Sequence, residues 1–172
     1  MEKTLVIYYS RRGENYVNGS ITKIDKGNTE YIVEFIKEIA NADLFQIETV
    51  KKYSDSYMTC IEEAKAEAKA NERPELKKYI ENISEYKNII VAGPCWWGTY
   101  PYAIFTQLEK LDFTGKKVFP IMTHEGSGLA NAASDLRKYC KGAEVGKGLA
   151  IHGEDAKNAK VEVEKYLKEN VI

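Results

Sequence analysis

The run Asn88–Gly93, NIIVAG, is the most strand-like segment of the chain. Thr4–Tyr9 and Lys117–Thr123 are similar apolar runs, and continuous runs of this kind are typical of parallel strands buried on both faces. Leu44–Val50 and Val145–Ile151 complete a set of five predicted strands.

Segments with helical spacing separate these strands. They are Thr29–Ala40, Ser54–Asn71, Tyr102–Leu111, Leu129–Cys140 and Asp155–Asn170, with a short helical connection predicted over Leu76–Ile83. Alternation of strands and helices predicts an α/β fold, in which a five-stranded parallel sheet lies between two layers of helices. Ligands of such sheets bind outside the carboxyl ends of the strands, so the loops that follow the strands are the candidate site.

Length and charge exclude several classes of protein. The chain has 172 residues, which suits one domain over residues 1–172, and its net charge is -1. This balance disfavours nucleic acid as a partner, because such binders usually show a basic surplus. The apolar runs are far shorter than the roughly 20 residues of a spanning helix, so no membrane association is predicted.

The cysteines and the N-terminus favour a cytoplasmic protein. Cys60, Cys95 and Cys140 are far apart in sequence and form no C-x-x-C pair, so no metal site is predicted. The start of the chain lacks the pattern of a signal peptide. We therefore expect a cytoplasmic location with reduced thiols.

The loop after the first strand holds Ser10, Arg11 and Arg12, and the helix after it opens at Asn28 and Thr29. Free N–H groups at a helix start attract anions, so these residues are candidates for binding a phosphate. An ordinary helix cap with solvated arginines explains the same residues equally well. The loop contains neither G-x-G-x-x-G nor a P-loop motif, which disfavours dinucleotide and P-loop nucleotide binding.

The loop after the third strand contains both tryptophans of the chain. Its residues are Pro94, Cys95, Trp96, Trp97 and Gly98, and Pro101 follows. Flat side chains at a strand end can stack on a planar ring or wall its pocket. The alternatives are an anchor for a protein partner or packing into the core, but two adjacent tryptophans of an extended segment cannot both point into one core.

The loop after the fourth strand is rich in glycine. It consists of Thr123, His124, Glu125, Gly126, Ser127 and Gly128. Its backbone N–H and C=O groups can approach a heterocycle closely, although a flexible turn explains the glycines as well. Taken together, the three loops predict a ligand with a phosphate, a spacer and a planar polar ring.

At the residues of the last two loops the sequence resembles the flavodoxin family, whose bacterial members carry P-x-W-W-G and T-H-x-G-S-G loops. The resemblance implies a flavodoxin-like sandwich with strand order 2-1-3-4-5 and FMN as cofactor. It also implies that Ser10, Asn28 and Thr29 take the phosphate, while the other two loops hold the ring. Residues 11–26 depart from the short loop of the family, and we expect an arm there that covers the flavin or shapes a substrate pocket.

The resemblance implies flavin-dependent electron transfer, and its direction stays open. One possibility is an electron carrier with a redox partner protein. The alternative is an FMN-dependent NAD(P)H:quinone-type oxidoreductase with a small acceptor, and a second alternative is a phosphate-ligand binding module without redox chemistry. The residues indicate no catalytic acid or base, and a homodimer is a further expectation.

Overall fold

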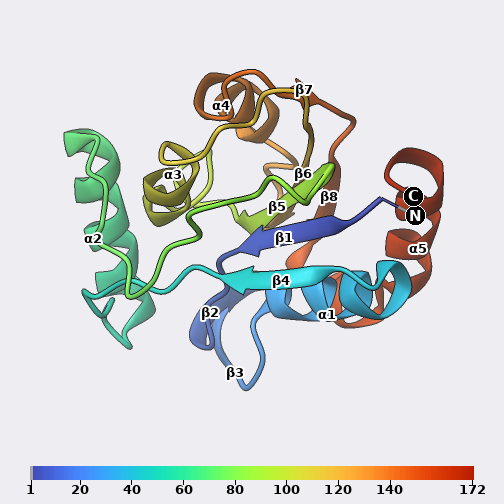
Figure 1. Cartoon of the computed structure of the whole chain (residues 1–172). Helices are drawn as coiled ribbons and strands as arrows, with labels where there is room; N and C mark the ends of the chain where they lie inside the picture. The colour runs from blue at the N-terminus through green and yellow to red at the C-terminus, as the bar shows by residue number, and fades with distance from the viewer. Residues whose placement is uncertain (1) are drawn as a thin grey trace.

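The computed structural model describes residues 2–172 and has a parallel sheet through its centre (Figure 1). The sheet order, in the numbering of Figure 1, is β4-β1-β5-β6, followed by a fifth strand in two pieces that both pair with β6. This is the predicted order with one difference in detail, the divided last strand. The strands are β4 (Asp43–Gln46), β1 (Thr4–Tyr8), β5 (Asn88–Pro94), β6 (Lys117–His124), β7 (Glu144–Val145) and β8 (Leu149–His152).

Pro120 and two glycines account for the division of the last strand. The Val118 carbonyl accepts the Gly146 N–H, so the backbone of Pro120, two residues on, also faces the fifth strand, where it has no N–H to donate. A side chain on Gly146 would begin 2.6 Å from the Phe119 ring, and one on Gly148 would begin 2.7 Å from Leu129. The predicted strand over 145–151 is therefore interrupted at the position where the ladder lacks a donor.

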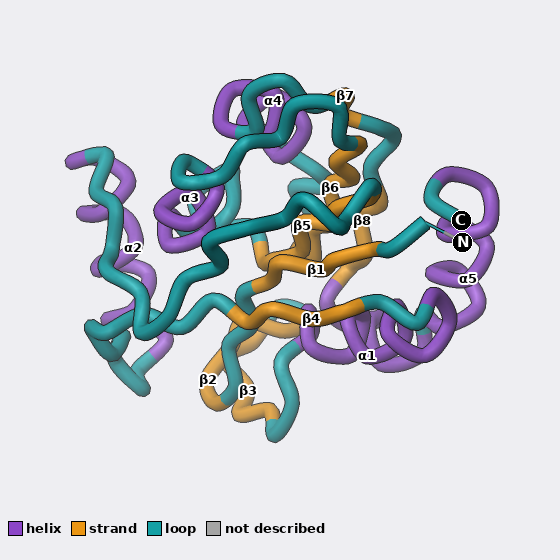
Figure 2. The backbone as a smooth tube through the Cα atoms, viewed as in Figure 1, coloured by secondary structure: helices purple, strands orange, loops and turns teal. Residues whose placement is uncertain are grey.

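Helices cover both faces of the sheet, as predicted (Figures 1 and 2). On one face lie α1 (Asn28–Ala40) and α5 (Lys160–Asn170), and on the other lie α3 (Tyr102–Leu108) and α4 (Ala132–Tyr139). A 3-10 helix, η1 (Gly153–Asn158), precedes α5, which therefore begins later than predicted. The helix α2 (Tyr57–Ala70) lies beside α3, beyond the carboxyl ends of β1 and β4.

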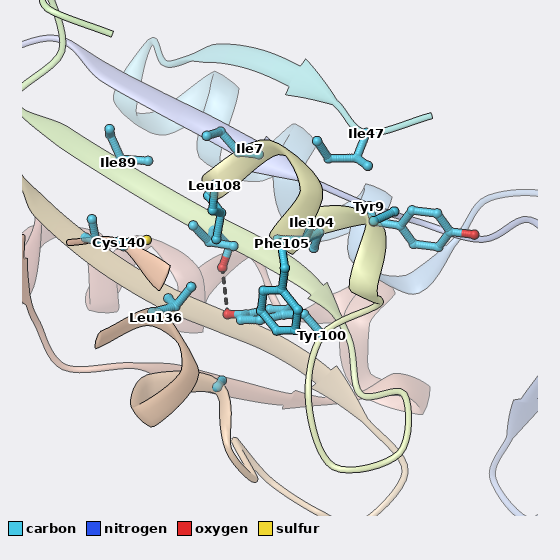
Figure 3. Packing of buried hydrophobic residues seen from close by; sticks show 14 of the residues in the cluster. Ile7, Tyr9, Ile47, Ile89, Tyr100, Ile104, Phe105, Leu108, Leu136 and Cys140 are labelled. Atoms are coloured by element: carbon cyan, nitrogen blue, oxygen red, sulfur yellow. Dashed lines mark hydrogen bonds between the residues drawn. The ribbon is translucent and has the colours of Figure 1, made fainter. Parts of the chain in front are cut away.

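Alternating side chains of the central strands build two cores. Leu5 and Ile7 pack toward α3 and α4, whereas Val6 between them packs toward α1 and α5. Each fully buried aliphatic side chain of this kind contributes about 1.5–3 kcal/mol. Figure 3 shows the first of these cores, where the Tyr100 hydroxyl donates to the Val91 carbonyl at 2.9 Å.

The segment Leu76–Ile83 is not helical, which corrects the prediction. Leu76 forms an antiparallel bridge with Thr49, and the Gln107 side chain bonds both the N–H and the carbonyl of Ile80, at 2.7 and 3.1 Å. These partners satisfy backbone groups that a helix would otherwise pair. No helix within residues 2–172 is long and apolar enough to cross a membrane.

The arm expected within residues 11–26 is a β-hairpin. Its strands β2 (Gly13–Val17) and β3 (Ser20–Ile24) pair in antiparallel fashion. The turn at its tip consists of Asn18 and Gly19, whose φ values of 49° and 84° are those of a two-residue hairpin turn.

Candidate functional site

A cavity of about 440 Å³ opens at the carboxyl ends of β1, β5 and β6. Its volume falls within the roughly 300–1,000 Å³ of small-molecule and cofactor pockets. Its walls come from the hairpin and the start of α1, the tryptophan loop, the loop after β6, and one side of α2. The lining residues are Arg11, Asn15, Tyr16, Asn28, Tyr57, Cys60, Ile61, Ala64, Pro94, Cys95, Trp96, Trp97, Thr123, His124, Glu125, Gly126 and Ser127.

Most of the residues singled out in the sequence lie together in this wall. Those that line the cavity are Arg11, Asn28, Pro94, Cys95, Trp96, Trp97, Thr123, His124, Glu125, Gly126 and Ser127. Those that do not line it are Ser10, Arg12, Thr29, Gly98 and Gly128. The three loops therefore converge as expected, while several side chains of the first loop face elsewhere.

The Ser10 hydroxyl caps α1 from outside the helix. Its Oγ accepts the N–H of Glu30 at 3.1 Å, and a Cβ on Gly27 would lie 2.0 Å from that oxygen. Arg12 forms a two-point ion pair with the Glu30 carboxylate and leaves 68% of its side chain exposed. Both side chains are thus engaged with the helix start and not with the cavity.

The Thr29 side chain is buried, and its hydroxyl pairs with that of Thr123 at 2.8 Å. This contact joins the start of α1 to the end of β6. Within residues 2–172, no protein oxygen accepts the backbone N–H of Asn28 or of Thr29. Two donors at the helix start are therefore free for an anion next to the Asn28 side chain.

The two tryptophans point in different directions. Trp97 and Gly98 form a tight turn with φ values of 56° and 83°, closed by the Trp96 N–H and the Thr99 carbonyl at 2.7 Å. Trp97 is 51% exposed, its Nε1 donates to the Ile61 carbonyl at 2.9 Å, and the Lys65 ammonium lies 5.3 Å from the ring centroid. A contact with α2 thus fixes Trp97 at the edge of the cavity.

Trp96 is held by an aromatic cluster behind the cavity wall. Its ring meets those of Tyr9 and Tyr53 edge to face, at centroid distances of 5.0 and 5.3 Å. The Tyr53 hydroxyl donates to the carboxylate of Glu67, a residue that is only 2% exposed. Burial raises the pKa of Glu67, while the hydrogen bond from Tyr53 and the nearby Lys51 ammonium oppose the rise.

His124 is the last residue of β6, His152 is the last residue of β8, and the Glu125 carboxylate follows β6. His124 Nδ1 accepts the Gly126 N–H at 2.9 Å, and its ring meets that of His152 at 5.5 Å. Partial burial, and then the His152 charge, lower the pKa of His124. Glu125 lies 4.0 Å from His152 Nε2, and partial burial raises the pKa of its carboxyl.

The hairpin forms one wall of the cavity. The Asn18 N–H at its tip donates to Glu125 at 3.1 Å, and the Tyr57 N–H donates to the Glu14 carboxylate at 3.1 Å. The Tyr16 and Tyr57 rings stack with centroids 6.1 Å apart and planes 25° apart. The hairpin therefore spans from the start of α2 to the loop after β6.

Comparison with known proteins identifies the family. The sequence model described as flavodoxin matches residues 21–169. This chain belongs to the flavodoxin family. No curated protein sequence matches it. The resemblance inferred from the tryptophan and glycine loops and the predicted fold class are thereby confirmed.

Solved structures with the same fold cover nearly all of this flavodoxin. A protein of Bacteroides uniformis described as a flavoprotein is 26% identical, with a TM-score of 0.75 over 97% of this chain and 98% of that one. A similar protein of Bacteroides eggerthii is 22% identical, with a TM-score of 0.78 over 100% and 99%. A Lactobacillus acidophilus flavoprotein in complex with FMN is 20% identical, with a TM-score of 0.65 over 93% and 98%.

One part of the cavity wall in this flavodoxin was not predicted from the sequence, and another was predicted only as an arm without named residues. Tyr57, Cys60, Ile61 and Ala64 come from α2, where their spacing of three and four residues marks one helix face. That periodicity was visible in the sequence. It does not indicate whether this face of the helix packs on the sheet or lines a cavity. Asn15 and Tyr16 come from the hairpin, the arm that was expected within residues 11–26 to cover the flavin or shape a pocket.

Proposed function

We propose that this flavodoxin, a single domain over residues 1–172, holds FMN in the cavity and uses it for electron transfer. FMN is the cofactor predicted from the sequence, and both the family and the FMN complex of the Lactobacillus protein support it. The observation that carries the proposal is the convergence of a helix start, a tryptophan loop and a glycine-rich loop on one cavity of cofactor size.

The residues present fit the two ends of FMN. At the start of α1, the free N–H groups of Asn28 and Thr29 suit the phosphate, and the Asn28 side chain lines the same corner. Ser10 acts indirectly, because its hydroxyl caps the helix that presents these donors. In this proposal, backbone N–H groups bind the phosphate, and the side chains of Ser10 and Thr29 do not.

The ring end of the cavity combines flat and polar walls. Trp96 and Trp97 supply aromatic surface, and residues 123–127, at the end of the neighbouring strand β6, supply backbone groups. Bound FMN supplies the electron chemistry, since a flavin accepts and releases electrons singly or in pairs. The protein binds and orients the ring, and the α2 face limits the access of water to it.

Titration of the flavin-free protein with FMN tests binding. We expect the flavin bands near ~375 and ~450 nm to persist after removal of free FMN, and reduction by dithionite followed by reoxidation with ferricyanide to be complete and reversible. Binding of inorganic phosphate without any affinity for FMN would instead support the binding module without redox chemistry.

A second candidate function is NAD(P)H:quinone-type reduction. The hairpin favours it, because Tyr16 and Tyr57 add an aromatic wall to the cavity mouth that suits a small planar acceptor. An electron carrier needs long-range attraction for its redox partner. The net charge of -1 provides little such attraction for a basic protein, which favours the reductase over the carrier.

Turnover separates the two uses of the flavin. A reductase is expected to oxidise NADH or NADPH with a quinone acceptor much faster than an equal concentration of free FMN does. Turnover equal to that of free FMN would favour the carrier function and a protein partner. Sedimentation velocity of the loaded protein tests the expected homodimer.

A further inference from the structure

The Arg11 side chain is fixed in the cavity wall by backbone carbonyls. Its Nε donates to the Glu14 carbonyl at 2.9 Å, and one terminal nitrogen donates to the carbonyls of Ser54 and Asp55 at 2.9 and 3.2 Å. These acceptors come from the hairpin and from the segment before α2. The guanidinium is therefore held in one orientation before any ligand arrives.

The charge of Arg11 has no paired carboxylate. Within the described part of the chain, no carboxylate oxygen lies within 4.0 Å of the guanidinium nitrogens. Glu14 and Asp55 accept hydrogen bonds from Arg11 only through their backbone carbonyls. The Glu14 carboxylate instead accepts the Tyr57 N–H, and that of Asp55 lies 3.5 Å from Lys52. Arg12, one residue on, is by contrast paired with Glu30 at the surface.

The charge of Arg11 acts on the α2 side of the cavity. Burial raises the pKa of the Cys60 thiol, and Arg11 is the leading group that opposes this rise. It likewise opposes the rise that burial causes in the pKa values of Tyr9 and Tyr57. Cys60 and Tyr57 line the cavity beside Ile61, which accepts the Trp97 indole N–H.

We propose that Arg11 makes bound FMN easier to reduce by stabilising negative charge on its ring. This rests on the proposed binding of FMN in the cavity. Addition of two electrons and one proton to a flavin leaves one negative charge on the ring system. A cation that is fixed in a partly buried wall stabilises that negative charge more than a solvated cation does. The fixed cation does not have to reorient when the charge forms.

The effect is measurable as a preference for reduced over oxidised FMN. The ratio of the two dissociation constants sets the difference in midpoint potential between bound and free FMN. Each tenfold change in that ratio is about 30 mV for a two-electron couple. The reductant in the experiment is dithionite, with an indicator dye of known potential as the reference.

Arg11→Gln and Arg11→Lys separate charge from hydrogen bonding. In Arg11→Gln we expect the preference for reduced FMN to fall at least tenfold, so the midpoint potential drops by about 30 mV or more. Arg11→Lys keeps the charge but loses the fixed hydrogen bonds to the backbone carbonyls, so its fall is expected to be smaller than that of Arg11→Gln. Arg12→Gln is the control, because Arg12 lies outside the cavity wall, and it is expected to leave the preference unchanged.

The outcomes distinguish the possible errors. An unchanged potential in Arg11→Gln, or an equal fall in Arg11→Lys, refutes the proposal. A failure of the wild type to bind FMN refutes the proposed function instead. Arg11→Met, which keeps the aliphatic stem, repeats the charge removal if Arg11→Gln does not fold.

Riboflavin separates an effect on the ring from an effect on the phosphate. If Arg11 acts on the ring, bound riboflavin shows the same drop in potential in Arg11→Gln as FMN does. If Arg11 instead binds the phosphate, the variant weakens oxidised and reduced FMN equally and leaves riboflavin unaffected. The second pattern is incompatible with the proposal.

Discussion

The backbone N–H of Asn18 donates to the Glu125 carboxylate at 3.1 Å and joins the tip of the β2–β3 hairpin to the loop after β6. The two residues are 107 positions apart in sequence. Because the hairpin and this loop both line the cavity, the hydrogen bond closes one side of the candidate FMN site. It also offers a direct way to test whether the hairpin retains the cofactor.

Glu125→Ala is expected to release FMN faster. Loss of one partly exposed, charge-assisted hydrogen bond costs about 1 kcal/mol, which corresponds to a roughly fivefold higher dissociation rate. Stopped-flow fluorescence of released flavin measures that rate. Glu154→Ala is the control, because Glu154 lies 3.8 Å from the His152 ring and the Asn18 N–H donates to Glu125 and not to Glu154. Equal release rates in both variants would show that the hairpin does not retain FMN.

Trp97→Ala is expected to weaken FMN binding by about 1–3 kcal/mol, as for loss of a stacking side chain. Trp97→Phe keeps an aromatic ring and loses the indole hydrogen bond to Ile61, so its affinity for FMN is expected to lie between those of the wild type and Trp97→Ala. Fluorescence titration gives the dissociation constants. An unchanged affinity in Trp97→Ala would place this ring outside the flavin contact.

Thr29→Val is expected to destabilise the flavin-free protein by about 1–3 kcal/mol, because it leaves the buried Thr123 hydroxyl without its partner. The double variant Thr29→Val/Thr123→Val is expected to cost less than the two single changes added together, since no hydroxyl then lacks a partner. Urea unfolding measures all three. The control is Thr22→Val in the exposed hairpin, with an expected change within about 0.5 kcal/mol. Strict additivity would mean that the hydroxyl pair contributes nothing.

Glu67 predicts a dependence of stability on pH. Burial raises its pKa above the ordinary 4.5, so its contribution to stability is present below that value and is lost as the pH rises through the raised one. Glu67→Gln cannot ionise, so the stability of the wild type relative to this variant is expected to fall from pH 4.5 to 7. Urea unfolding at several pH values measures the difference. Glu62→Gln, at an exposed position of the same helix, is expected to follow the wild type at every pH.

The local pattern of the chain predicted the elements of the fold well and their connections less well. The buried runs of β1, β5 and β6 were visible because strands covered on both faces are apolar throughout. Leu76–Ile83 was mispredicted because its backbone partners are Thr49 and the Gln107 side chain, which lie far away in sequence. Local propensity carries no information about such partners.

The sequence by itself determined the parallel sheet and the three loops that meet at its carboxyl edge, because periodicity and glycine, proline and tryptophan positions are local signals. The strand order was expected only from the resemblance to the flavodoxin family. Only the tertiary structure decided which side chains face the cavity. Ser10 and Thr29 turn to a helix cap and a buried hydroxyl pair, whereas Arg11 and one face of α2 join the wall. The physical reason is that a side chain takes its direction from hydrogen bonds and packing with segments that are distant in sequence.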